Sequence, residues 1–548
     1  MMLKINRQSL LCHKPEHMAL FCTLFFITFF NISFWQRLSV WLSPLGFYEI
    51  TVFFMVFLLI GAVLYLVFCL LLIPFLFKPV AISLILATSA ISYFMMQYGV
   101  MIEKNMVRNA AQTDFLESLD LISWGMIVWL FLTALLPIAI IIKTKIQYRS
   151  LYREILVRSA FVFAACCTIA LVGFCYYQDF ASLFRNHREI RFVVTPFNYL
   201  QATSSYLKEH FATPKALVLI GQDAKHFTRS NQPQVLVLVV GETARADHFS
   251  LNGYSRETNP KLSQAQDIIN FSNMWSCGTE TAVSIPCMFS GIPREKFELD
   301  IAAGQENVLD VLRHTKKIDV LWLDNNSGCK GVCERVAGEK LFETKPSATY
   351  CEGQECFDEV LVESLQQQLK KISRDTVIVL HQKGSHGPAY YKRYPKKFAV
   401  FQPECQTSEL QKCTQAEITN SFDNTILYTD YVLDKIIGLL NTQQHITTAM
   451  WYLSDHGESL GENNLYLHAT PYVFAPDAQK HIPMLMWFSA NWQQQNRVSL
   501  TCLGKQTARL YSHDNVFSTL LGLMQVQTQV YQRERDILAH CQKDPFNV

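Results

Sequence analysis

The stretch QVLVLVVGETARADH, residues 234–248, decides the fold. Its residues 235–240 are all apolar and β-prone, which is typical of a strand buried on both faces of a parallel sheet. Strands that alternate with helices predict an α/β domain with a mostly parallel sheet flanked by helices. Similar apolar runs, with helix-length patterns such as SFDNTILYTDYVLDKIIGLL (421–440) among them, recur in IDVLWLDNN (318–326), DTVIVLHQ (375–382) and TTAMWYLSDHGE (447–458).

The whole chain is too long for this one domain. Its 548 residues exceed the size at which single hydrophobic cores stop growing. The net charge is +2 and no run of basic residues occurs, so nucleic acid is disfavoured as a partner. We therefore expect at least two domains, one of which precedes residue 234.

The N-terminal part contains windows without any charged side chain. Each is near or above the roughly 18 residues that a membrane-spanning helix needs. One such window would also fit a buried helix or a signal peptide, but a succession does not, and the first lacks a small-x-small cleavage site. A five-helix transmembrane domain is therefore predicted for residues 1–178, with spans in Met18–Gln36, Ile50–Phe77, Pro79–Ile102, Leu121–Ile142 and Ser159–Gln178.

Basic residues in the short loops predict the orientation of these spans. Lys4, Arg7 and Lys14 precede the first span, and residues 143–158 carry five basic side chains against a single acid, Glu154. Loops rich in lysine and arginine stay in the cytoplasm. Because five spans is an odd number, everything after residue 178 is expected on the outer side.

The cysteines agree with that topology. Six of the 16 lie within the first 178 residues, and the other ten lie in the exported part at short spacings. An even number of closely spaced cysteines is typical of disulfides in an oxidising compartment. Zinc-binding thiolates are disfavoured because no repeated CxxC spacing occurs. The predicted pairs are 277–287, 329–333, 351–356, 405–413 and 502–541.

The exported part begins with a connector. Residues 179–233 contain short amphipathic pieces such as DFASLFRNHREIRFVV (179–194) and FNYLQATSSYLKEHF (197–211), which mix aromatic and basic residues. This pattern is typical of helices that lie on a bilayer surface. An amphipathic periplasmic linker over 179–233 and a catalytic domain over 234–548 are therefore predicted.

Polar residues follow the apolar runs, where the carboxyl ends of parallel strands meet and ligands bind. Carboxylate and imidazole groups without thiolates favour Zn²⁺, with Mn²⁺ as the alternative. Three of the residues, Glu242, Asp455 and His456, would hold the ion and leave one position open. The full set is Glu242, Asp324, Asn326, Lys330, His386, Asp455, His456 and His468.

Thr281 is the candidate for the open position. It lies in SCGTETAVSIPCMFSG (276–291), between Cys277 and Cys287, at a predicted helix start. A hydroxyl next to a metal ion and at a helix N-terminus ionises far more easily than a free alcohol. Thr281 is therefore expected both to join the metal site and to act as a nucleophile.

Each of these residues also has a purely structural interpretation. Glu242 and Thr281 fit helix caps, and the pair Asp455 and His456 fits a hydrogen-bonded turn. His386 and His468 fit ordinary surface histidines. Only the shared position at strand ends, and not any single residue, distinguishes a reactive site from these alternatives.

Several motifs together resemble the phosphoethanolamine transferases that modify lipid A. That family belongs to the alkaline phosphatase superfamily, and its fold is a sulfatase-like sandwich behind a five-span anchor. The resemblance covers nearly the whole chain and implies a multi-pass protein of the Gram-negative inner membrane with a periplasmic catalytic domain. The motifs are VVGETARADHFSLNGYSRETNPKL (239–262), CGTETAVSIPCMFSG (277–291), DNNSGCKG (324–331), HGPAYYKRYP (386–395) and SDHGESLGENNLYLHATPYVFAP (454–476).

The resemblance also implies roles for individual residues of the periplasmic part. Thr281 would accept phosphoethanolamine beside a Zn²⁺ held by Glu242, Asp455 and His456. Asn326 would contact substrate, and the remaining polar residues would lie around the phosphate or a second metal ion; these are Lys330, His386 and His468.

A second implied site lies in the loop after the third span. Asn109, Thr113 and Glu117 are spaced by four residues, which would place them on one helix face. This face resembles the family's site for the phosphoethanolamine head group, with the carboxylate suited to the ammonium. The alternative is a solvated helix face that binds nothing.

Two departures from the family pattern occur, Glu280 beside the nucleophile and Ser385 in GSHGP. Neither removes an expected ligand, but Glu280 adds a charge that would alter the preference for an acceptor.

These expectations combine into a two-step transfer. Thr281 takes phosphoethanolamine from phosphatidylethanolamine, the donor beside the anchor, and a lipid A phosphate then accepts it. The added ammonium lowers the negative charge of the surface, so cationic peptides such as polymyxin bind less well. We expect the protein to act as a monomer.

Rival functions share much of this pattern. A phosphoglycerol transferase would have the same anchor, threonine and metal, although the CGTETAVSIPC segment favours phosphoethanolamine. Transfer to core sugars of lipopolysaccharide stays open. A sulfatase is disfavoured because Met288 stands where the Ser-x-Pro-x-Arg motif needs arginine. A zinc-stabilised scaffold without chemistry is the alternative outside the enzymes.

Overall fold

The computed structural model describes residues 12–113, 115–211, 216–227, 232–344, 347–352 and 355–542. The chain forms two compact units. The first comprises Met1–Val107 and Ile122–Ser205, and the second comprises Arg108–Leu121 and Tyr206–Val548. The segment 108–121, which follows the third predicted span, therefore belongs to the unit that contains the sheet.

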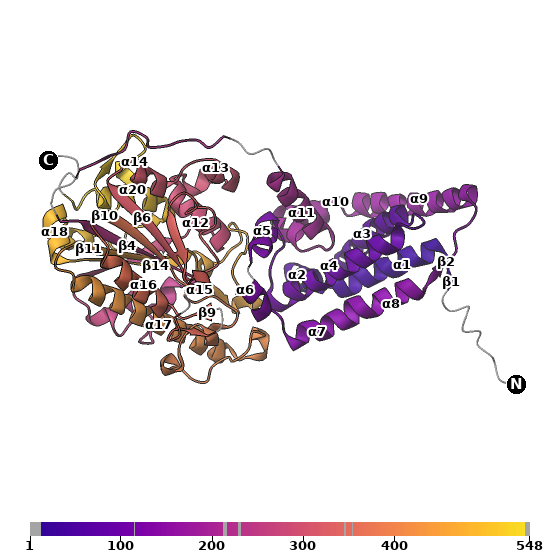
Figure 1. Ribbon diagram of the computed structural model, residues 1–548. Coiled ribbons are helices and arrows are strands. Elements are labelled where there is room, and N and C mark those ends of the chain that lie inside the picture. Colours follow the sequence, from indigo (N-terminus) through magenta and orange to yellow (C-terminus); the bar gives the residue numbers. More distant parts are fainter. Residues whose placement is uncertain are drawn as a thin grey trace. The chain divides into compact units, whose positions relative to one another are not determined.

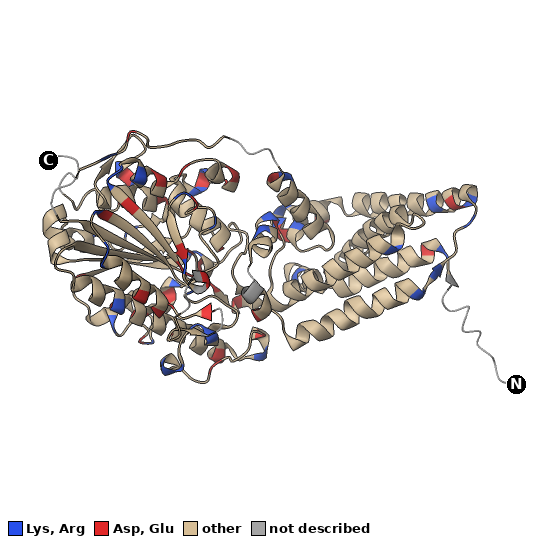
Figure 2. Ribbon diagram, viewed as in Figure 1, with Lys and Arg blue, Asp and Glu red and all other residues tan. Residues whose placement is uncertain are grey.

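The first unit contains helices that are long and apolar enough to cross a membrane. Figure 2 shows few charged residues in the middle parts of these helices and more of them at the ends. Four helical segments qualify singly: α3 (Phe47–Leu71), α4 (Phe77–Tyr98), Trp124–Lys143, which contains α7 (Trp124–Leu130) and α8 (Leu136–Lys143), and α9 (Leu151–Cys175). Large apolar side chains such as Phe54, Phe163 and Phe174 are exposed on them.

The first predicted span is a bent pair rather than one straight helix. Segments Pro15–Phe29 and Ile32–Trp41 meet at 58°, and counting them together gives the five predicted spans. They contain α1 (Pro15–Phe25) and α2 (Ile32–Trp41). The break lies at buried Asn31, whose amide nitrogen donates to the carbonyls of Phe26 (3.0 Å) and Thr195 (3.1 Å). A polar side chain that bonds the backbone in this way interrupts the helical ladder.

The last predicted span begins earlier than its uncharged window. Helix α9 starts at Leu151, eight residues before Ser159, and includes charged residues. Glu154 forms ion pairs with Arg149 (3.5 Å) and Arg158 (3.3 Å). Because these charges are paired, they extend the helix rather than end it.

Short helices follow the spans. They are α10 (Tyr177–Asn186), a 3₁₀ turn (Arg188–Phe192) and α11 (Phe197–His210), and two further helices, α5 (Lys104–Gln112) and α6 (Phe115–Asp120), lie between α4 and α7 in the chain. The division into three parts at residues 178 and 233 stays a prediction.

The second unit is built on an eight-stranded sheet of order β15-β5-β14-β11-β4-β10-β6-β7. The four predicted strands are confirmed and run parallel in the middle. Strand β14 runs antiparallel to both of its neighbours. The bounds are β4 (Gln234–Gly241), β5 (Ile268–Trp275), β6 (Ile318–Asp324), β7 (Ala337–Lys340), β10 (Asp375–His381), β11 (Thr447–Ser454), β14 (His481–Phe488) and β15 (Tyr511–Ser512).

Helices cover both faces of this sheet (Figure 1). Strand β4 explains why: Leu236, Leu238 and Val240 enter one apolar core, and the alternate residues enter the other. The first core packs against α12 (Thr281–Ser290), α14 (Val308–His314), α18 (Ala490–Asn496) and α20 (Val516–Leu523). The second packs against α16 (Glu359–Leu369) and α17 (Gln415–Asn441). The predicted α/β class is thus confirmed.

The smaller elements of the second unit lie in its loops. They are α13 (Leu299–Ala303), α15 (Leu341–Thr344), α19 (Leu500–Gly504), β3 (Lys225–His226), β8 (Cys351–Glu352), β9 (Glu355–Cys356), β12 (Ser459–Leu460), β13 (Tyr466–Leu467) and β16 (Val526–Gln527).

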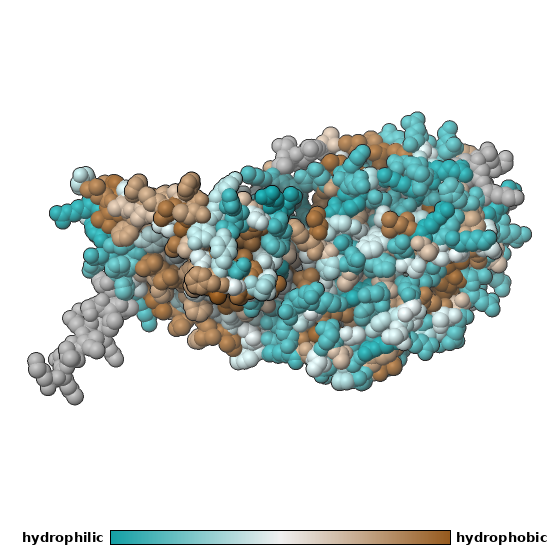
Figure 3. All heavy atoms as spheres, turned by 180° about the vertical axis from the view of Figure 1, so that it is seen from behind, coloured by the Kyte–Doolittle hydropathy of each residue, from teal (hydrophilic) through white to brown (hydrophobic). Residues whose placement is uncertain are grey.

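The two units also differ in surface chemistry. Figure 3 shows apolar side chains gathered over the membrane helices and mostly polar ones over the sheet-containing unit. All five predicted disulfides are confirmed, and all of them lie in the second unit: 277–287, 329–333, 351–356, 405–413 and 502–541.

Candidate active site

The register of two parallel strands brings the first two candidate ligands together. Gly241, the last residue of β4, pairs with Ser454, the last residue of β11. The next residues are Glu242 and Asp455, so both carboxylates leave the sheet at one point. The backbone N–H of Asp455 donates to the carbonyl of Gly241 (2.9 Å), which continues the ladder one residue further.

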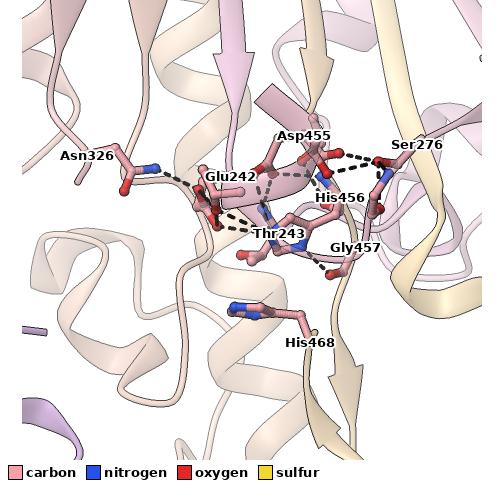
Figure 4. A network of polar contacts seen from close by, with 12 residues as sticks. Glu242, Thr243, Ser276, Asn326, Asp455, His456, Gly457 and His468 are labelled. Atoms are coloured by element: carbon pink, nitrogen blue, oxygen red, sulfur yellow. Dashed lines mark hydrogen bonds and ion pairs between the residues drawn. The ribbon is translucent and has the colours of Figure 1, made fainter. Parts of the chain in front are cut away.

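Thr281 meets this pair as the first residue of α12. Its hydroxyl lies 3.3 and 3.2 Å from the two carboxylate oxygens of Glu242 and 3.4 Å from Nε2 of His456. Figure 4 shows Glu242, Asp455 and His456 gathered at this point. All four side chains are buried. The structure therefore brings together the four residues that the sequence predicts at the metal.

His456 is held in the form that a metal ligand needs. Its Nδ1 lies 2.8 Å from the carbonyl oxygen of Gly457, which can only accept, so Nδ1 carries the proton. The lone pair then sits on Nε2, 3.5 Å from Glu242 and 3.4 Å from Asp455. Burial, reinforced by the charge of His468, lowers the pKa of His456 to about 4. The ring is therefore neutral at physiological pH, as metal binding requires.

The donor set fits a divalent cation. One ligand atom each from Glu242, Asp455 and His456 lies within 4.8 Å of the others. Asp455 Oδ1 accepts the N–H groups of Thr243 (3.2 Å) and His456 (2.7 Å), but Oδ2 accepts no hydrogen bond from the described residues. A fully buried carboxylate oxygen without a donor is costly unless a cation compensates it. Two carboxylates and one imidazole suit Zn²⁺.

Asn326 supports Glu242 from the neighbouring strand end. Its amide nitrogen donates to Glu242 Oε2 (2.6 Å) and to the carbonyl of Gln382 (2.9 Å), and lies 3.2 Å from Nε2 of His381. Asp324 does not join the ligands, because its carboxylate bonds Nδ1 of His381 at 3.0 Å. Burial alone would raise the pKa of Asp324, but the imidazole outweighs it and lowers the pKa to about 2.

Replacing Asn326 with leucine tests this support. The variant keeps the branched shape of the side chain but removes the donor to Glu242, so the carboxylate loses its orientation. We expect the zinc affinity and kcat each to fall by about 10- to 100-fold. Both are measured on the purified full-length protein by chelator competition and steady-state kinetics. The matched control is Asn325→Leu, whose amide contacts Asp358 and the Cys356 carbonyl instead; an equal loss of zinc affinity there would contradict the assignment.

A second polar group lies next to the first. His468 and Glu458 join at 2.8 Å, and Glu458 also accepts the hydroxyl of Tyr390 at 2.8 Å. Ligand atoms of His456, Glu458 and His468 again lie within 4.8 Å of one another. Burial lowers the pKa of His468, but Glu458 outweighs burial and raises it to about 9. His468 is therefore cationic near neutral pH, and its ring centroid lies 4.6 Å from that of His456.

The loop after β10 places His386 at the same site. Its ring centroid lies 5.9 Å from that of His468. Gly384 adopts a left-handed conformation (φ +52°), and a Cβ there would lie 2.7 Å from the carbonyl oxygen of Glu242. Only glycine permits this close approach. The neighbouring N–H of Ser385 then donates to that same carbonyl at 3.0 Å.

Lys330 lies on a cavity beside the nucleophile helix. Its ammonium donates to the carbonyl (3.1 Å) and hydroxyl (2.9 Å) of Ser327. The cavity measures about 570 Å³, and Ala282 and Pro286 of α12 line it together with Lys330. The described lining also includes Arg108 and Gln112 of α5 but neither Asn109 nor Thr113.

The predicted helix face of Asn109, Thr113 and Glu117 is wrong. Helix α5 ends at Gln112, and Glu117 belongs to the separate helix α6. The Thr113 hydroxyl donates to the carbonyl of Asn109 (2.8 Å), a side-chain bond that competes with the helical ladder. The side chain of Glu117 lies outside the described part of the chain, so the binding role of these residues stays a prediction.

Sequence reasoning missed four buried residues at this edge of the sheet: Ser276, His381, Glu458 and His513. A histidine that ends the apolar run of β10, as His381 does, is a signal that could have been used. Glu458 stands two residues after the predicted ligand His456 in SDHGE. His513 had no such signal, because the strand before it, β15, has only two residues. Burial lowers the pKa of His513 to about 3.

Two known families match the chain. The Sulfatase family matches residues 234–526, and the family "Phosphoethanolamine transferase EptA/EptB" matches residues 60–211. Phosphoethanolamine transferase EptA of Escherichia coli (strain K12) is 44% identical over 472 residues, which is 85% of this chain and 86% of that protein. Phosphatidylethanolamine transferase Mcr-1 of Escherichia coli is 36% identical over 82% of this chain and 84% of its own length.

A solved structure has the same fold throughout. The integral membrane lipooligosaccharide phosphoethanolamine transferase A (EptA) from Neisseria meningitidis superposes with a TM-score of 0.94 at 36% identity. The match covers 97% of this chain and 99% of that one. The chain is thus a multi-pass membrane protein with a sulfatase-like domain, and it belongs to the EptA family of phosphoethanolamine transferases.

Proposed function

We propose that this protein transfers phosphoethanolamine from phosphatidylethanolamine to a phosphate of lipid A, through a covalent intermediate on Thr281. It works as a zinc-dependent monomer in the inner membrane, with its catalytic unit in the periplasm. The single observation that carries the proposal is the Thr281 hydroxyl, 3.2 Å from Glu242 and 3.4 Å from His456, beside a buried carboxylate oxygen of Asp455 that has no donor among the described residues.

The surroundings of Thr281 favour loss of its proton. The hydroxyl donates to the Glu242 carboxylate, which draws the proton away, and it sits at the N-terminus of α12, where partial positive charge favours an anionic oxygen. A Zn²⁺ held by Glu242, Asp455 and His456 would supply Lewis-acid stabilisation of negative charge at this point. Asn326 holds Glu242 in position for the ion.

The transfer takes two displacements at phosphorus. In the first, the Thr281 oxygen forms a bond to the phosphorus of the donor, and the bond from phosphorus to the diacylglycerol oxygen breaks. The leaving oxygen takes a proton and departs as diacylglycerol. In the second, a lipid A phosphate oxygen attacks the phosphorus bound to Thr281, the bond to Thr281 breaks, and the Thr281 oxygen recovers its proton from Glu242. A covalent intermediate of this kind gives ping-pong kinetics.

Imidazole and ammonium side chains stabilise the transferred phosphate. His468, with its raised pKa and its bond to Glu458, supplies a proton to the leaving oxygen and a positive charge to the phosphate. The Lys330 ammonium, which lines the adjoining cavity, stabilises equatorial oxygens of the phosphate, and His386, beside His468, donates a hydrogen bond to them. Asn109, Thr113 and Glu117 are proposed to hold the ethanolamine head group of the donor.

The product explains a benefit to the cell. Each transferred group adds an ammonium and so lowers the net negative charge of the outer surface. Cationic peptides such as polymyxin are attracted by that charge, so their binding weakens. We therefore propose that the protein confers polymyxin resistance.

Mass spectrometry of lipid A tests the proposal. Cells that express the full-length protein are expected to show a phosphoethanolamine-sized mass increment on lipid A, and cells with an empty vector are not. A glycerophosphate-sized increment would instead indicate phosphoglycerol transfer, and an increment confined to the core sugars would indicate the other acceptor. No increment of any kind, with the protein present in the membrane, would refute the transferase.

A further inference from the structure

A buried histidine links the segment of the candidate ligands Asp455 and His456 to the segment that contains Thr281. His513 follows β15, which pairs in parallel with β5, so it leaves the sheet at the same edge as the metal ligands. It is 1% exposed. The residue lies more than 50 positions from Asp455 and more than 200 from Thr281 in the chain. No role follows for it from the two-step transfer itself.

The two ring nitrogens of His513 contact opposite segments. Nε2 lies 3.1 Å from the carbonyl oxygen of Ser454, which can only accept, so Nε2 carries the proton and donates. Nδ1 is then bare and accepts the backbone N–H of Cys277 at 3.3 Å. Ser454 directly precedes Asp455, and Cys277 begins the disulfide-bonded segment that contains Thr281. One neutral tautomer satisfies both bonds at once.

Ser276 makes a parallel link between the same segments. Its hydroxyl contacts the carbonyl of Asp455, as Figure 4 shows, and lies 2.8 Å from the carbonyl of Gly278. It also accepts the N–H of Gly278 (3.1 Å) and lies 3.4 Å from Nδ1 of His513. The ligand segment 454–456 and the nucleophile segment 276–281 are therefore joined through the side chains of Ser276 and His513, neither of which is a candidate metal ligand.

We propose that His513 is a positioning residue for the transfer: its imidazole fixes the separation between the Thr281 hydroxyl and the side chains of Asp455 and His456. The physical reason is that each of the two ring nitrogens bonds the backbone of one segment. The ring bonds Ser454, the residue before Asp455, and Cys277 in the nucleophile segment, so its loss frees both. This inference rests on the proposed function, because it assigns the distance that the first displacement requires.

The test compares three variants of the full-length protein at saturating Zn²⁺. His513→Phe keeps a ring but removes both bonds, and we expect kcat to fall by about 10- to 100-fold with the KM for phosphatidylethanolamine within about twofold. His513→Gln keeps a donor toward Ser454, and His513→Asn keeps an acceptor toward Cys277. Each is expected to recover part of the lost rate. Zinc affinity, measured by chelator competition, should be lowest in His513→Phe and higher in the Gln and Asn variants.

A buried histidine at the opposite edge of the sheet serves as the control. His226 pairs with Asp375 at the start of β10 (3.1 Å) and is buried like His513. His226→Phe should lower the melting temperature but leave kcat unchanged. Wild-type kcat and zinc affinity in His513→Phe would overturn the inference, as would a rate loss in both histidine variants that simply follows their melting temperatures.

Two further outcomes are also decisive. If His513→Phe fails to fold, wild-type kcat in both the Gln and the Asn variant overturns the inference, and graded losses support it. If the wild-type protein transfers no phosphoethanolamine at all, the proposed function fails instead. The zinc affinities of the variants then still report whether His513 positions Asp455 and His456.

Discussion

Replacing Thr281 with valine is expected to lower phosphoethanolamine transfer by about 10⁴-fold or more, the scale seen when a covalent nucleophile is removed. Valine keeps the shape and the buried surroundings of Thr281 but has no oxygen to attack phosphorus. Since the hydrogen bonds of Thr281 to Glu242 and His456 are long, at 3.2–3.4 Å, and valine fills the same space, the fold should persist. The readout is release of diacylglycerol and the phosphoethanolamine increment on lipid A.

Thr281→Ser is the matched control, because it retains the hydroxyl and loses only a methyl group. It should keep measurable transfer. Peptide mass spectrometry should find phosphoethanolamine on the peptide that contains residue 281 in the wild-type and Ser proteins, after incubation with donor alone. Equal lipid A increments from the Val variant and the wild type would rule out Thr281 as the nucleophile.

Removing the metal is expected to cause the second largest loss. Full-length protein treated with a chelator should lose transfer, and added Zn²⁺ should restore it. Asp455→Asn should weaken zinc binding by more than about 100-fold, beyond the effect of residues that only orient a ligand. In the wild type, Zn²⁺ at 1,000 times its Kd should add about 4 kcal/mol of stability, and the variant should gain far less.

Without metal, Asp455 is expected to destabilise the protein rather than stabilise it. Asp455 Oδ2 is buried without a donor among the described residues, so the carboxylate destabilises the empty site. Asp455→Asn removes that charge, and the metal-free variant should melt no lower than the metal-free wild type. A metal-free variant that melts well below it, or a wild type that transfers fully after chelation, would contradict a metal role for Asp455.

Local patterns were sufficient for much of the fold. The uncharged windows correspond to four single helices and one bent pair, and the four apolar runs are the four central parallel strands. Errors arose where side chains act on the backbone. Asn31 breaks the first span through its bond to the Phe26 carbonyl, and α5 ends at Gln112, before the predicted helix face is complete. Hydropathy does not report such side-chain bonds.

The candidate site was only partly visible in the sequence. Glu242, Asp455 and His456 stand at strand ends, and Thr281 stands at a helix start, so the pattern predicted their neighbourhood. Their roles stay proposals. Asp324 stands at a strand end as well, but it bonds His381 instead of joining the ligands. The local sequence of Asp324 does not differ from that of a ligand, because only its spatial neighbour decides.

The sequence by itself determined the membrane spans, the oxidised compartment, the four central strands and the residue types at their ends, because each depends on neighbours within about ten positions or on charge. Only the tertiary structure decided that Glu242 lies beside Asp455 and that His513 joins Ser454 to Cys277. Those contacts depend on the register of strands some 200 residues apart. Register is set by packing across the whole sheet, which no local pattern contains.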